Sequence, residues 1–227
     1  MNDLKTKLDN VRAKVAEASR NAGRAGEVVR LLAVSKLQPE SKIRRLFAAG
    51  QLDFGENYVQ EGLQKQQQLA DLAICWHFIG PLQSNKSREV AEHFSWVQSV
   101  DREKLLRRLS AQRPKSLPPL NICLQVNIDN EPQKAGADAA DIPGLARLAL
   151  SLPGLRLRGL MAIPAVTKDG QTDEQSLARV AELFNSLRAG GMALDTLSLG
   201  MSADLETAIK AGSTMVRIGT DLFGPRQ

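Results

Sequence analysis

The sequence has 227 residues, of which 43% are hydrophobic and 24% charged, and its formal net charge is +5. This balance is typical of a folded globular protein and excludes an intrinsically disordered chain. A transmembrane helix needs about 18 apolar residues, and no uncharged apolar stretch reaches that length. The charged segment 1–14 is unlike a secretory signal. The sequence therefore predicts a cytoplasmic protein with no membrane partner.

Helical periodicities and short apolar runs alternate along the chain, which is the pattern of crossover helices around a parallel sheet. In chain order, the predicted elements are a helix at 2–22, a strand at 28–35, a helix at 39–49, a strand at 52–55, a helix at 57–70, a strand at 75–79, a helix at 84–92, a strand at 94–97, a helix at 101–112, a strand at 120–128, a helix at 138–151, a strand at 155–161, a helix at 173–189, a strand at 197–200, a helix at 202–211 and a strand at 215–218. Eight strands of this kind predict an α/β fold, a single-domain (β/α)8 TIM barrel over residues 1–227.

The two ends of the predicted barrel depart from the regular pattern. The chain ends soon after the strand at 215–218, which leaves no room for an eighth trailing helix, so the extra helix at 2–22 is expected to cover that gap. Ser202 is expected to cap the helix at 202–211, with Asp204 in its first turn.

The sequence offers few metal ligands. Cys75 and Cys123 form no CxxC pair, which excludes a disulfide framework and a four-cysteine zinc site and predicts buried free thiols. His77 and His93 are the only histidines, so no metal site is predicted. His93 is expected at the surface, whereas His77 is equally suited to a hydrogen-bonded core position or to a ligand site.

Functional residues of such barrels gather at the C-terminal ends of the strands. Lys36 directly follows the first apolar run, and Asn57, Met161 and Ser198 lie at the ends of other strands. Burial would lower the pKa of a lysine and make its amine a nucleophile toward an aldehyde. The alternative for Lys36 is a side chain that extends to solvent.

The loops after the last two strands have the composition of an anion site. The segment 200–202 reads Gly-Met-Ser, and Gly219 is followed by Thr220. Glycines allow close backbone approach and hydroxyls donate hydrogen bonds, and phosphate sites recur in these loops. The alternative is an ordinary helix cap at Ser202 and a simple turn at Gly219.

Arg217 lies within the last predicted strand, where a charged guanidinium needs an anion or an acceptor. An ion pair with Asp204 or Glu206 is the structural alternative. Together with Lys36 and a phosphate cradle, Arg217 suits a site for pyridoxal 5′-phosphate (PLP). A lysine-based aldolase acting on a phosphorylated sugar would need similar parts, and the residues alone do not separate the two.

A nucleic-acid partner is not expected. The charge is mild, only 4% of the residues are aromatic, and the basic helix at 101–113 also carries Asp101 and Glu103. Nucleic-acid binders more often combine a basic stripe with interleaved aromatic residues. An interaction or RNA-binding role for this helix is the alternative, and steep salt dependence of binding would support it.

Six segments carry a resemblance to the pyridoxal phosphate homeostasis protein family over nearly the whole chain. They are LLAVSK (31–36), FGENYVQE (54–61), WHFIGPLQSNK (76–86), LQVNIDNEPQKAG (124–136), RGLMAI (158–163) and LSLGMSADLETAIKAGSTMVRIGTDLFG (197–224). The resemblance implies a fold-type III PLP-binding barrel, like the barrel domain of alanine racemase, with an extra N-terminal helix and no C-terminal β domain.

The resemblance also implies roles for individual residues. Lys36 matches the lysine that forms a Schiff base with PLP, and Arg217 matches the arginine that faces the pyridine nitrogen. The remaining implied positions are Ser202, Gly219 and Thr220 at the phosphate, with Ser198 nearby, and Asn57, His77 and Met161 around the ring. Leu199 stands where the family often has methionine, and Lys134 matches a family lysine whose role stays open.

The implied function is intracellular PLP (vitamin B6) homeostasis by a cytoplasmic monomer that stores or delivers PLP, with indirect effects on amino-acid metabolism. PLP-dependent apoenzymes are the candidate recipients. An arginine can only donate to the pyridine nitrogen, which weakens the ring as an electron sink, and racemisation needs acid–base groups on both faces of the substrate. Tyr58 is the only tyrosine and lies on the barrel itself. A PLP-dependent amino-acid racemase or a Schiff-base lyase is therefore the alternative, and no catalytic residue is predicted.

Overall fold

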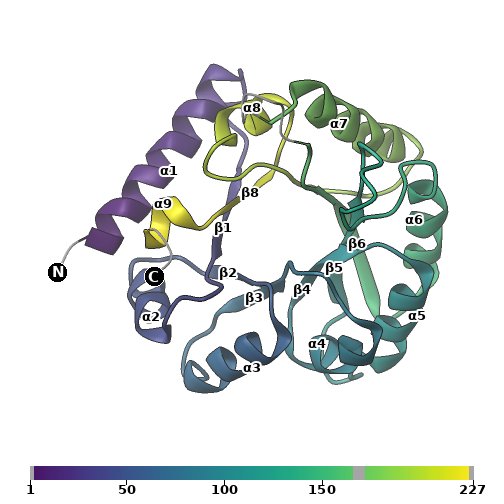
Figure 1. The fold of residues 1–227 in the computed structure, drawn as a ribbon, viewed down its shortest axis with the longest axis horizontal. Coiled ribbons are helices and arrows are strands. Elements are labelled where there is room, and N and C mark those ends of the chain that lie inside the picture. The colour runs from purple at the N-terminus through teal and green to yellow at the C-terminus, as the bar shows by residue number, and fades with distance from the viewer. Residues whose placement is uncertain (1–2, 166–171, 225–227) are drawn as a thin grey trace.

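The computed structural model describes residues 3–165 and 172–224. Within these residues, parallel strands form a closed barrel in sequence order from β1 to β8 (Figure 1). The strands are β1 (Arg30–Val34), β2 (Asp53–Glu56), β3 (Cys75–Phe78), β4 (Trp96–Val100), β5 (Leu120–Val126), β6 (Leu155–Ala162), β7 (Thr196–Ser198) and β8 (Met215–Ile218). The predicted α/β barrel is confirmed, with strand boundaries that shift by a few residues.

Helices surround the barrel as an outer ring (Figure 1). They are α1 (Asp3–Asn21), α2 (Glu40–Ala48), α3 (Val59–Gln68), the 3-10 turn η1 (Ser84–Lys86), α4 (Ser87–His93), α5 (Glu103–Gln112), α6 (Ile142–Ser151), α7 (Glu174–Ala189), α8 (Leu205–Lys210) and α9 (Thr220–Phe223). None of these described helices is both long and apolar enough to cross a membrane.

Two predictions at the C-terminal end of the chain are wrong. A one-turn helix, α9, follows β8 where no trailing helix was expected, because a single turn fits in the short remaining segment. Helix α8 begins at Leu205, and Ser202 lies in the turn before it rather than at the cap. Asp204 occupies the cap position, and its carboxylate accepts a hydrogen bond from the Met201 amide at 2.6 Å, which fixes the preceding turn.

Helix α1 closes the ring, as predicted. It packs against α2, α8 and α9 (Figure 1). Leu4, Leu8, Val11 and Val15 form its buried stripe. On the neighbouring face, the Arg12 guanidinium donates to the carbonyls that end α2, those of residues 49 and 50. The helix therefore covers the side of the barrel that α9 is too short to cover.

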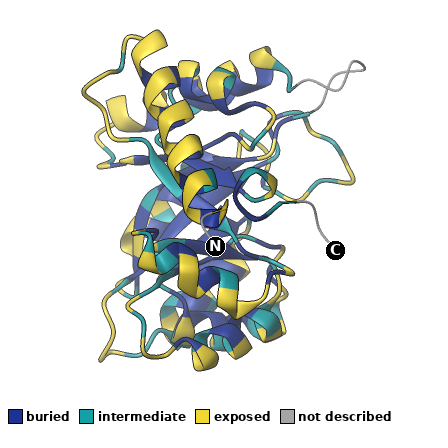
Figure 2. Cartoon of the chain, turned by 90° about the vertical axis from the view of Figure 1, so that its left-hand side faces the viewer, coloured by how far each residue is buried: buried dark blue, intermediate teal, exposed yellow. Residues whose placement is uncertain are grey.

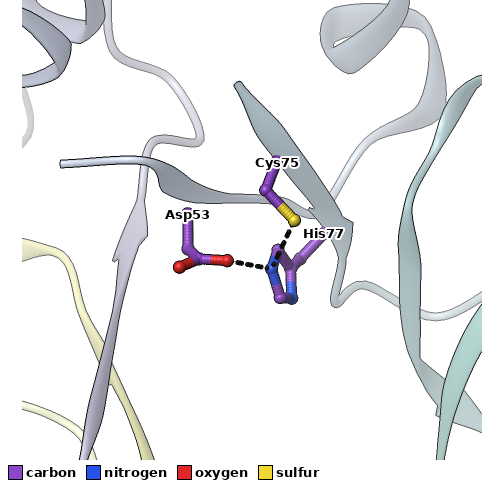
Figure 3. Close-up of side chains that lie close together, drawn as sticks. All are labelled: Asp53, Cys75 and His77. Carbon is purple, nitrogen blue, oxygen red and sulfur yellow. Dashed lines mark hydrogen bonds and ion pairs between the residues drawn. The ribbon is translucent and has the colours of Figure 1, made fainter. Parts of the chain in front are cut away.

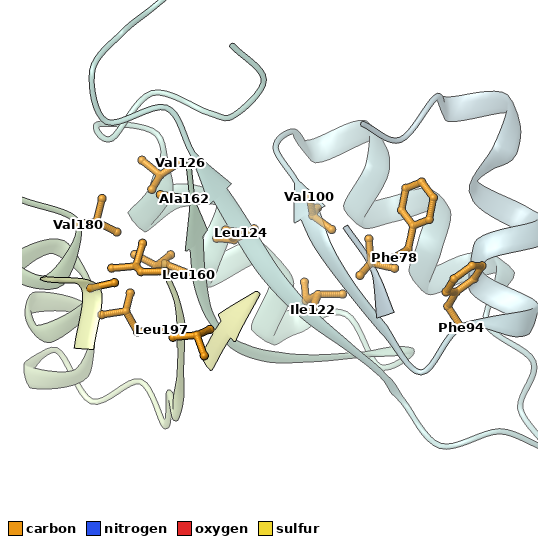
Figure 4. Packing of buried hydrophobic residues seen from close by; sticks show 14 of the residues in the cluster. Phe78, Phe94, Val100, Ile122, Leu124, Val126, Leu160, Ala162, Val180 and Leu197 are labelled. Atoms are coloured by element: carbon orange, nitrogen blue, oxygen red, sulfur yellow. The ribbon is translucent and has the colours of Figure 1, made fainter. Parts of the chain in front are cut away.

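The hydrophobic core lies between the barrel and its helices. Figure 2 shows buried strands inside and exposed residues on the outer helix faces. Leu160 and Leu197 on neighbouring strands pack with Val180 of α7, and the Phe78 and Phe94 rings meet edge to face at 5.5 Å (Figure 4). Inside the barrel, by contrast, several polar side chains are fully buried, and these lead to the functional site.

Candidate functional site

A cavity of about 290 Å³ opens at the C-terminal end of the strands. Seven of the nine predicted site residues line it, and they reach it from the ends of β1, β2, β6 and β8 and from the loop after β7. These residues are Lys36, Asn57, Met161, Ser202, Arg217, Gly219 and Thr220. The closed barrel thus brings together positions that are up to 184 residues apart in the sequence.

The apolar wall of this cavity was not predicted from the sequence. Val34, Ile79, Ile163 and Met201 also line it, and Ile163 and Met201 are 42% and 40% exposed at its mouth. Each of these four residues lies at a strand end or within two residues of a predicted site residue. Its position at the C-terminal edge of the barrel is therefore the signal that could have identified it. An apolar wall of this kind suits the face of an aromatic ring.

Lys36 lies in a tight turn that leaves β1. The Gln38 amide donates to the Ser35 carbonyl at 3.0 Å, which closes the turn. Leu37 has a φ of 59°, a left-handed conformation that costs a non-glycine residue about 1 kcal/mol or more. Contacts from neighbouring residues must hold such a turn in place. The hydrogen-bond partners of Ser35 and Leu37 therefore fix the position of the Lys36 backbone, from which its side chain extends.

A buried ion cluster holds this turn; we call Lys65, Glu56 and Glu61 the Lys65 cluster. The Lys65 ammonium donates to the Ser35 carbonyl at 2.6 Å, to Glu56 Oε1 at 2.8 Å and to Glu61 Oε1 at 2.6 Å. Glu61 Oε1 also accepts from the Leu37 amide at 2.6 Å. The cluster therefore binds the backbone on both sides of Lys36.

Glu56 is the fully buried member of the Lys65 cluster. Its side chain is 0% exposed, its Oε1 accepts from the Ser35 hydroxyl at 2.5 Å, and its Oε2 has no hydrogen-bond partner among the described residues. Burial raises the pKa of Glu56, and the charge and hydrogen bond of Lys65 offset this only in part. The carboxylate thus depends on the single lysine that also holds the Ser35 carbonyl.

Arg217 crosses the barrel interior beneath the cavity. Its guanidinium donates to the Ser198 carbonyl at 2.6 Å, to the Ser198 hydroxyl at 2.9 Å and to the Ala162 carbonyl at 2.8 Å. These bonds use three of the five N–H groups of the side chain. Burial lowers the pKa of Arg217 to about 10, partly offset by the charge of Asp204, so Arg217 stays a cation and a donor at neutral pH.

The loop after β7 presents Ser202 to the cavity. Gly200 has a φ of 90°, and a Cβ there would lie 2.5 Å from the Ala208 Cβ, so this position requires glycine. The Thr172 hydroxyl donates to Asp204 at 2.7 Å, which ties the loop to the chain before α7. Ser202 therefore lines the cavity together with Gly219 and Thr220 from a fixed turn rather than from a helix cap.

Asn57 presents an unsatisfied acceptor at the cavity wall. Its Oδ1 is buried and has no hydrogen-bond partner in the part of the chain that the structure describes, although the residue lines the cavity. A buried polar atom without a partner is costly, and a ligand group that donates to it would remove that cost. The backbone here packs tightly, since a Cβ at Gly80 would lie 2.0 Å from the Asn57 carbonyl oxygen.

Gly80→Ala is therefore expected to displace Asn57 and to destabilise the fold by about 1–3 kcal/mol through overpacking. Denaturant unfolding measures this change. Gly144→Ala is the control, because its added Cβ meets no atom within 4 Å and lies in α6, where alanine stabilises by up to about 1 kcal/mol. Equal stability of the Gly80→Ala variant and the native protein would contradict the tight packing.

The structure places two predicted site residues, His77 and Ser198, outside the cavity lining. Both are fully buried inside the barrel, beneath the residues that reach the cavity. The Ser198 hydroxyl accepts from Arg217 and donates to Gln98 Oε1 at 2.7 Å, and His77 Nδ1 lies 3.0 Å from Gln98 Nε2. Ser198 thus contacts the cavity residue Arg217, and His77 is linked to Ser198 through Gln98.

His77 also belongs to a cluster with Asp53 and Cys75 (Figure 3). Cys75 Sγ at 3.5 Å and Asp53 Oδ1 at 2.9 Å both approach the same nitrogen, Nε2. A catalytic triad needs its nucleophile and carboxylate on opposite nitrogens, and burial raises the pKa of the Cys75 thiol to about 12. Arg30 donates to the same Asp53 oxygen at 2.9 Å, so the arrangement favours a hydrogen-bonded cluster over a metal site.

This cluster was not anticipated from the sequence. Cys75 and His77 lie two positions apart on β3 and so face the same side, and Asp53 pairs with Cys75 across β2 and β3. The other cysteine, Cys123, is fully buried, and burial raises its pKa to about 12 as well. Both thiols are free, as predicted, although Cys75 is only partly buried.

Three further sequence features lie away from the cavity lining. Tyr58 is 55% exposed and is not among the described residues that line the cavity. On α5 and its ends, Arg108 and Arg113 donate to Ser87 and to backbone carbonyls, which occupies part of the predicted basic surface. Lys134 donates to the Pro164 carbonyl at 3.0 Å and pairs with Glu131.

Comparison with curated proteins supplies the decisive observation. The chain is 54% identical over 226 residues to the pyridoxal phosphate homeostasis protein of Pseudomonas aeruginosa, with 100% of this chain and 97% of that protein covered. This chain belongs to the pyridoxal phosphate homeostasis protein family. The Escherichia coli member of the family is 50% identical over 229 residues, with 100% of this chain and 98% of that protein covered. The family model of the alanine racemase N-terminal domain matches residues 6–227.

Solved structures agree with this assignment to the homeostasis family. PipY of Synechococcus elongatus, solved with PLP bound, has a TM-score of 0.83 and 36% identity, covering 97% of this chain and 100% of that chain. The same protein without PLP has a TM-score of 0.85 and 37% identity, with the same coverage. An alanine racemase of Clostridium difficile has a TM-score of 0.76 over 99% of this chain and 57% of that chain, at 14% identity, and shares the fold. The predicted resemblance to the family and its barrel is confirmed.

Proposed function

We propose that this protein binds PLP in the cavity at the C-terminal end of the barrel and acts in PLP homeostasis by holding the cofactor on Lys36 for storage or delivery. The observation that carries the proposal is that Lys36 and Arg217 line one cavity together with Ser202, Gly219 and Thr220. The homeostasis function named for its relatives and the PLP bound by PipY support the same conclusion.

The residues of the cavity fit this cofactor. The volume of about 290 Å³ is close to the lower end of small-molecule pockets, about 300–1,000 Å³. The donors are of the type that binds phosphate, namely two hydroxyls and a loop glycine. Asn57 Oδ1, which is buried, provides an acceptor that the described residues leave unused.

Each residue has a proposed task. Ser202, Gly219 and Thr220 would hold the phosphate, and Arg217 would donate to the ring nitrogen. Lys36 would hold the cofactor by condensing its amine with the aldehyde, and the aldehyde oxygen would leave as water. When bound, PLP supplies an aldehyde that condenses with amines and a ring that withdraws electrons.

The chemistry of the cavity favours a carrier over a racemase. Arg217 can only donate to a ring nitrogen, which keeps the ring unprotonated and weakens it as an electron sink. A racemase also needs a second acid–base group across from the lysine. Among the described residues that line the cavity, Lys36 is the only side chain with an amine, and none is a tyrosine or a histidine. We further propose that the protein works in the cytoplasm as a monomer and that PLP-dependent apoenzymes receive the cofactor.

The test is an absorption spectrum of the purified protein after addition of PLP, followed by borohydride reduction and peptide mass mapping. The expected result is a visible band that free PLP does not show, with the reduced adduct on Lys36. Pyridoxal, which lacks the phosphate, is the matched ligand control and is expected to bind much more weakly. No band, or adducts scattered over surface lysines, would overturn the proposal, and sustained exchange of an amino-acid α-proton would favour the racemase alternative.

A further inference from the structure

A continuous series of hydrogen bonds crosses the interior of the barrel; we call it the core network. Its bonds are Arg217 Nη1 to Ser198 Oγ at 2.9 Å, Ser198 Oγ to Gln98 Oε1 at 2.7 Å, Gln98 Nε2 to His77 Nδ1 at 3.0 Å, His77 Nε2 to Asp53 Oδ1 at 2.9 Å and Arg30 Nη2 to Asp53 Oδ1 at 2.9 Å. The series begins at the residue that lines the candidate PLP cavity and ends at the opposite end of the strands.

The middle of the core network is closed to water. Ser198, Gln98 and His77 are each 0% exposed. A buried polar group that loses its partner cannot replace it with solvent, so each member must keep the partner that it has. The network is therefore a fixed arrangement rather than one of several that exchange with water.

The two ends of the core network set the direction of every bond. Arginine can only donate and an ionised carboxylate can only accept. Although burial acts to raise the pKa of Asp53, the hydrogen bond from His77 and the charge of Arg30 hold that pKa below its usual value. Each intermediate group accepts from the Arg217 side and donates toward Asp53, which places the proton of His77 on Nε2.

The far end of the core network reaches a second cavity. This cavity, of about 510 Å³, is lined by Arg30 and Asp53 at the starts of β1 and β2 and by residues of α1. Trp96 packs against this end of the network. The His77 and Trp96 rings stack with 5.0 Å between their centroids, and the Arg30 guanidinium carbon lies 5.2 Å from the centre of the Trp96 ring. The network therefore joins the two ends of the barrel through its centre.

We propose that Ser198, Gln98 and His77 are positioning residues that fix the orientation of Arg217 and thereby direct its remaining N–H groups at the ligand in the PLP cavity. This inference rests on the proposed function for the identity of the ligand. The hydrogen-bond directions within the core network are a property of the protein alone. They provide a test that does not require PLP.

The arrangement depends on a neutral His77. A proton on Nδ1 would face the Gln98 amide N–H, and Gln98 would have to turn its amide and break the bond that Ser198 donates. The charged groups that face His77 are Asp53 and Arg30, with the Cys75 thiol beside them. Burial lowers the pKa of His77, against the opposing effect of Asp53, which keeps the ring neutral at neutral pH.

The first experiment is ¹⁵N NMR of the histidine side chains in the PLP-free protein, with exposed His93 as the second imidazole signal in the same spectrum. The expected result is a His77 ring that is neutral at about pH 7, with its proton on Nε2. A proton on Nδ1, or a charged His77 at about pH 7, would overturn the direction of the core network.

The second experiment compares Ser198→Ala with Ser213→Ala. Ser213 is a matched control, because it is also fully buried beside β7 and β8, but its described hydrogen bonds are all to backbone groups, namely the carbonyls of residues 197, 199 and 215 and the Leu199 amide. Ser198→Ala is expected to change the His77 tautomer signal and to weaken PLP binding about tenfold, whereas Ser213→Ala lowers Tm and changes neither. An unchanged His77 signal in Ser198→Ala would overturn the proposal.

The two readouts separate the proposals. If the wild-type protein fails to bind PLP, the proposed function fails, and the NMR comparison still shows whether Ser198 and His77 are coupled. If PLP binds and both serine variants weaken binding equally, the effect is structural and the positioning role is overturned. Gln98→Leu, which removes both central bonds, repeats the comparison should Ser198→Ala fail to fold.

Discussion

Lys36→Ala is expected to abolish the covalent attachment of PLP at this position and to lower the affinity for PLP by at least about 100-fold. The reason is that Lys36 is the amine that lines the cavity, so its loss removes the bond to the aldehyde while the phosphate residues remain. Equilibrium dialysis measures the affinity, and borohydride reduction with peptide mapping measures the attachment.

Three further lysine variants make this result specific. Lys36→Arg keeps the positive charge but cannot form the bond, so it separates charge from attachment. Lys104→Ala removes an exposed lysine on α5 and is expected to leave binding unchanged. Lys134→Ala tests the family lysine, which the structure places against the Pro164 carbonyl. An undiminished affinity in Lys36→Ala would show that the protein holds PLP elsewhere.

Lys65→Met is expected to destabilise the protein by about 3–5 kcal/mol, the largest effect on folding that we anticipate. The substitution leaves Glu56 charged and buried without its cation and removes one of the two donors to the Ser35 carbonyl, so that only the Gln38 amide remains. Denaturant unfolding at pH 8 measures the loss. Lys5→Met is the control, because the Lys5–Asp9 pair is exposed and is expected to contribute less than about 0.5 kcal/mol.

The cost of Lys65→Met is expected to fall as the pH is lowered. Burial raises the pKa of Glu56, so the folded state binds this proton more readily than the unfolded state does. At pH values between the unfolded-state pKa of Glu56, 4.5, and its raised folded-state pKa, the contribution of Glu56 to the free energy of unfolding decreases as the pH rises. Without Lys65 the folded-state pKa of Glu56 rises further, so this pH range extends to higher pH. In the variant, Glu56 therefore becomes protonated at mildly acidic pH, which removes the cost of burying its charge. A penalty that is constant from pH 8 to pH 5 would contradict this account.

Loss of stability in Lys65→Met is expected to be accompanied by weaker PLP binding, because Lys65 and Glu61 hold the backbone on both sides of Lys36. Glu61→Gln provides a milder comparison. The amide oxygen can still accept from Leu37, but the charge near Lys65 is lost, so the turn is kept while the ion cluster is weakened.

The barrel was predictable from the sequence alone because the hydrophobic patterns that indicate its strands and helices are local. Apolar runs such as 120–128 and helical stripes such as Leu4, Leu8 and Val11 follow from the periods of strand and helix, and their alternation leaves few topologies. Boundaries were less well predicted. Ser202 has the composition of a cap, but Asp204 takes that position because its carboxylate reaches the Met201 amide.

The candidate site was predictable to the extent that it lies at strand ends. Lys36, Arg217 and Thr220 are informative residue types at positions that the barrel topology sends to one edge, so chain order was enough to group them. The apolar wall at Ile79 and Ile163 was missed, because apolar residues at strand ends give the same pattern whether they line a cavity or the core.

What the sequence by itself determined is therefore the fold, the family and the edge of the barrel that carries the cavity. Only the tertiary structure decided that His77 and Ser198 lie beneath the cavity in the core network and that Lys65 holds the turn at Lys36. The physical reason is that hydrogen bonds and ion pairs between distant segments depend on side-chain direction and distance to within an ångström, and neither is encoded in local periodicity.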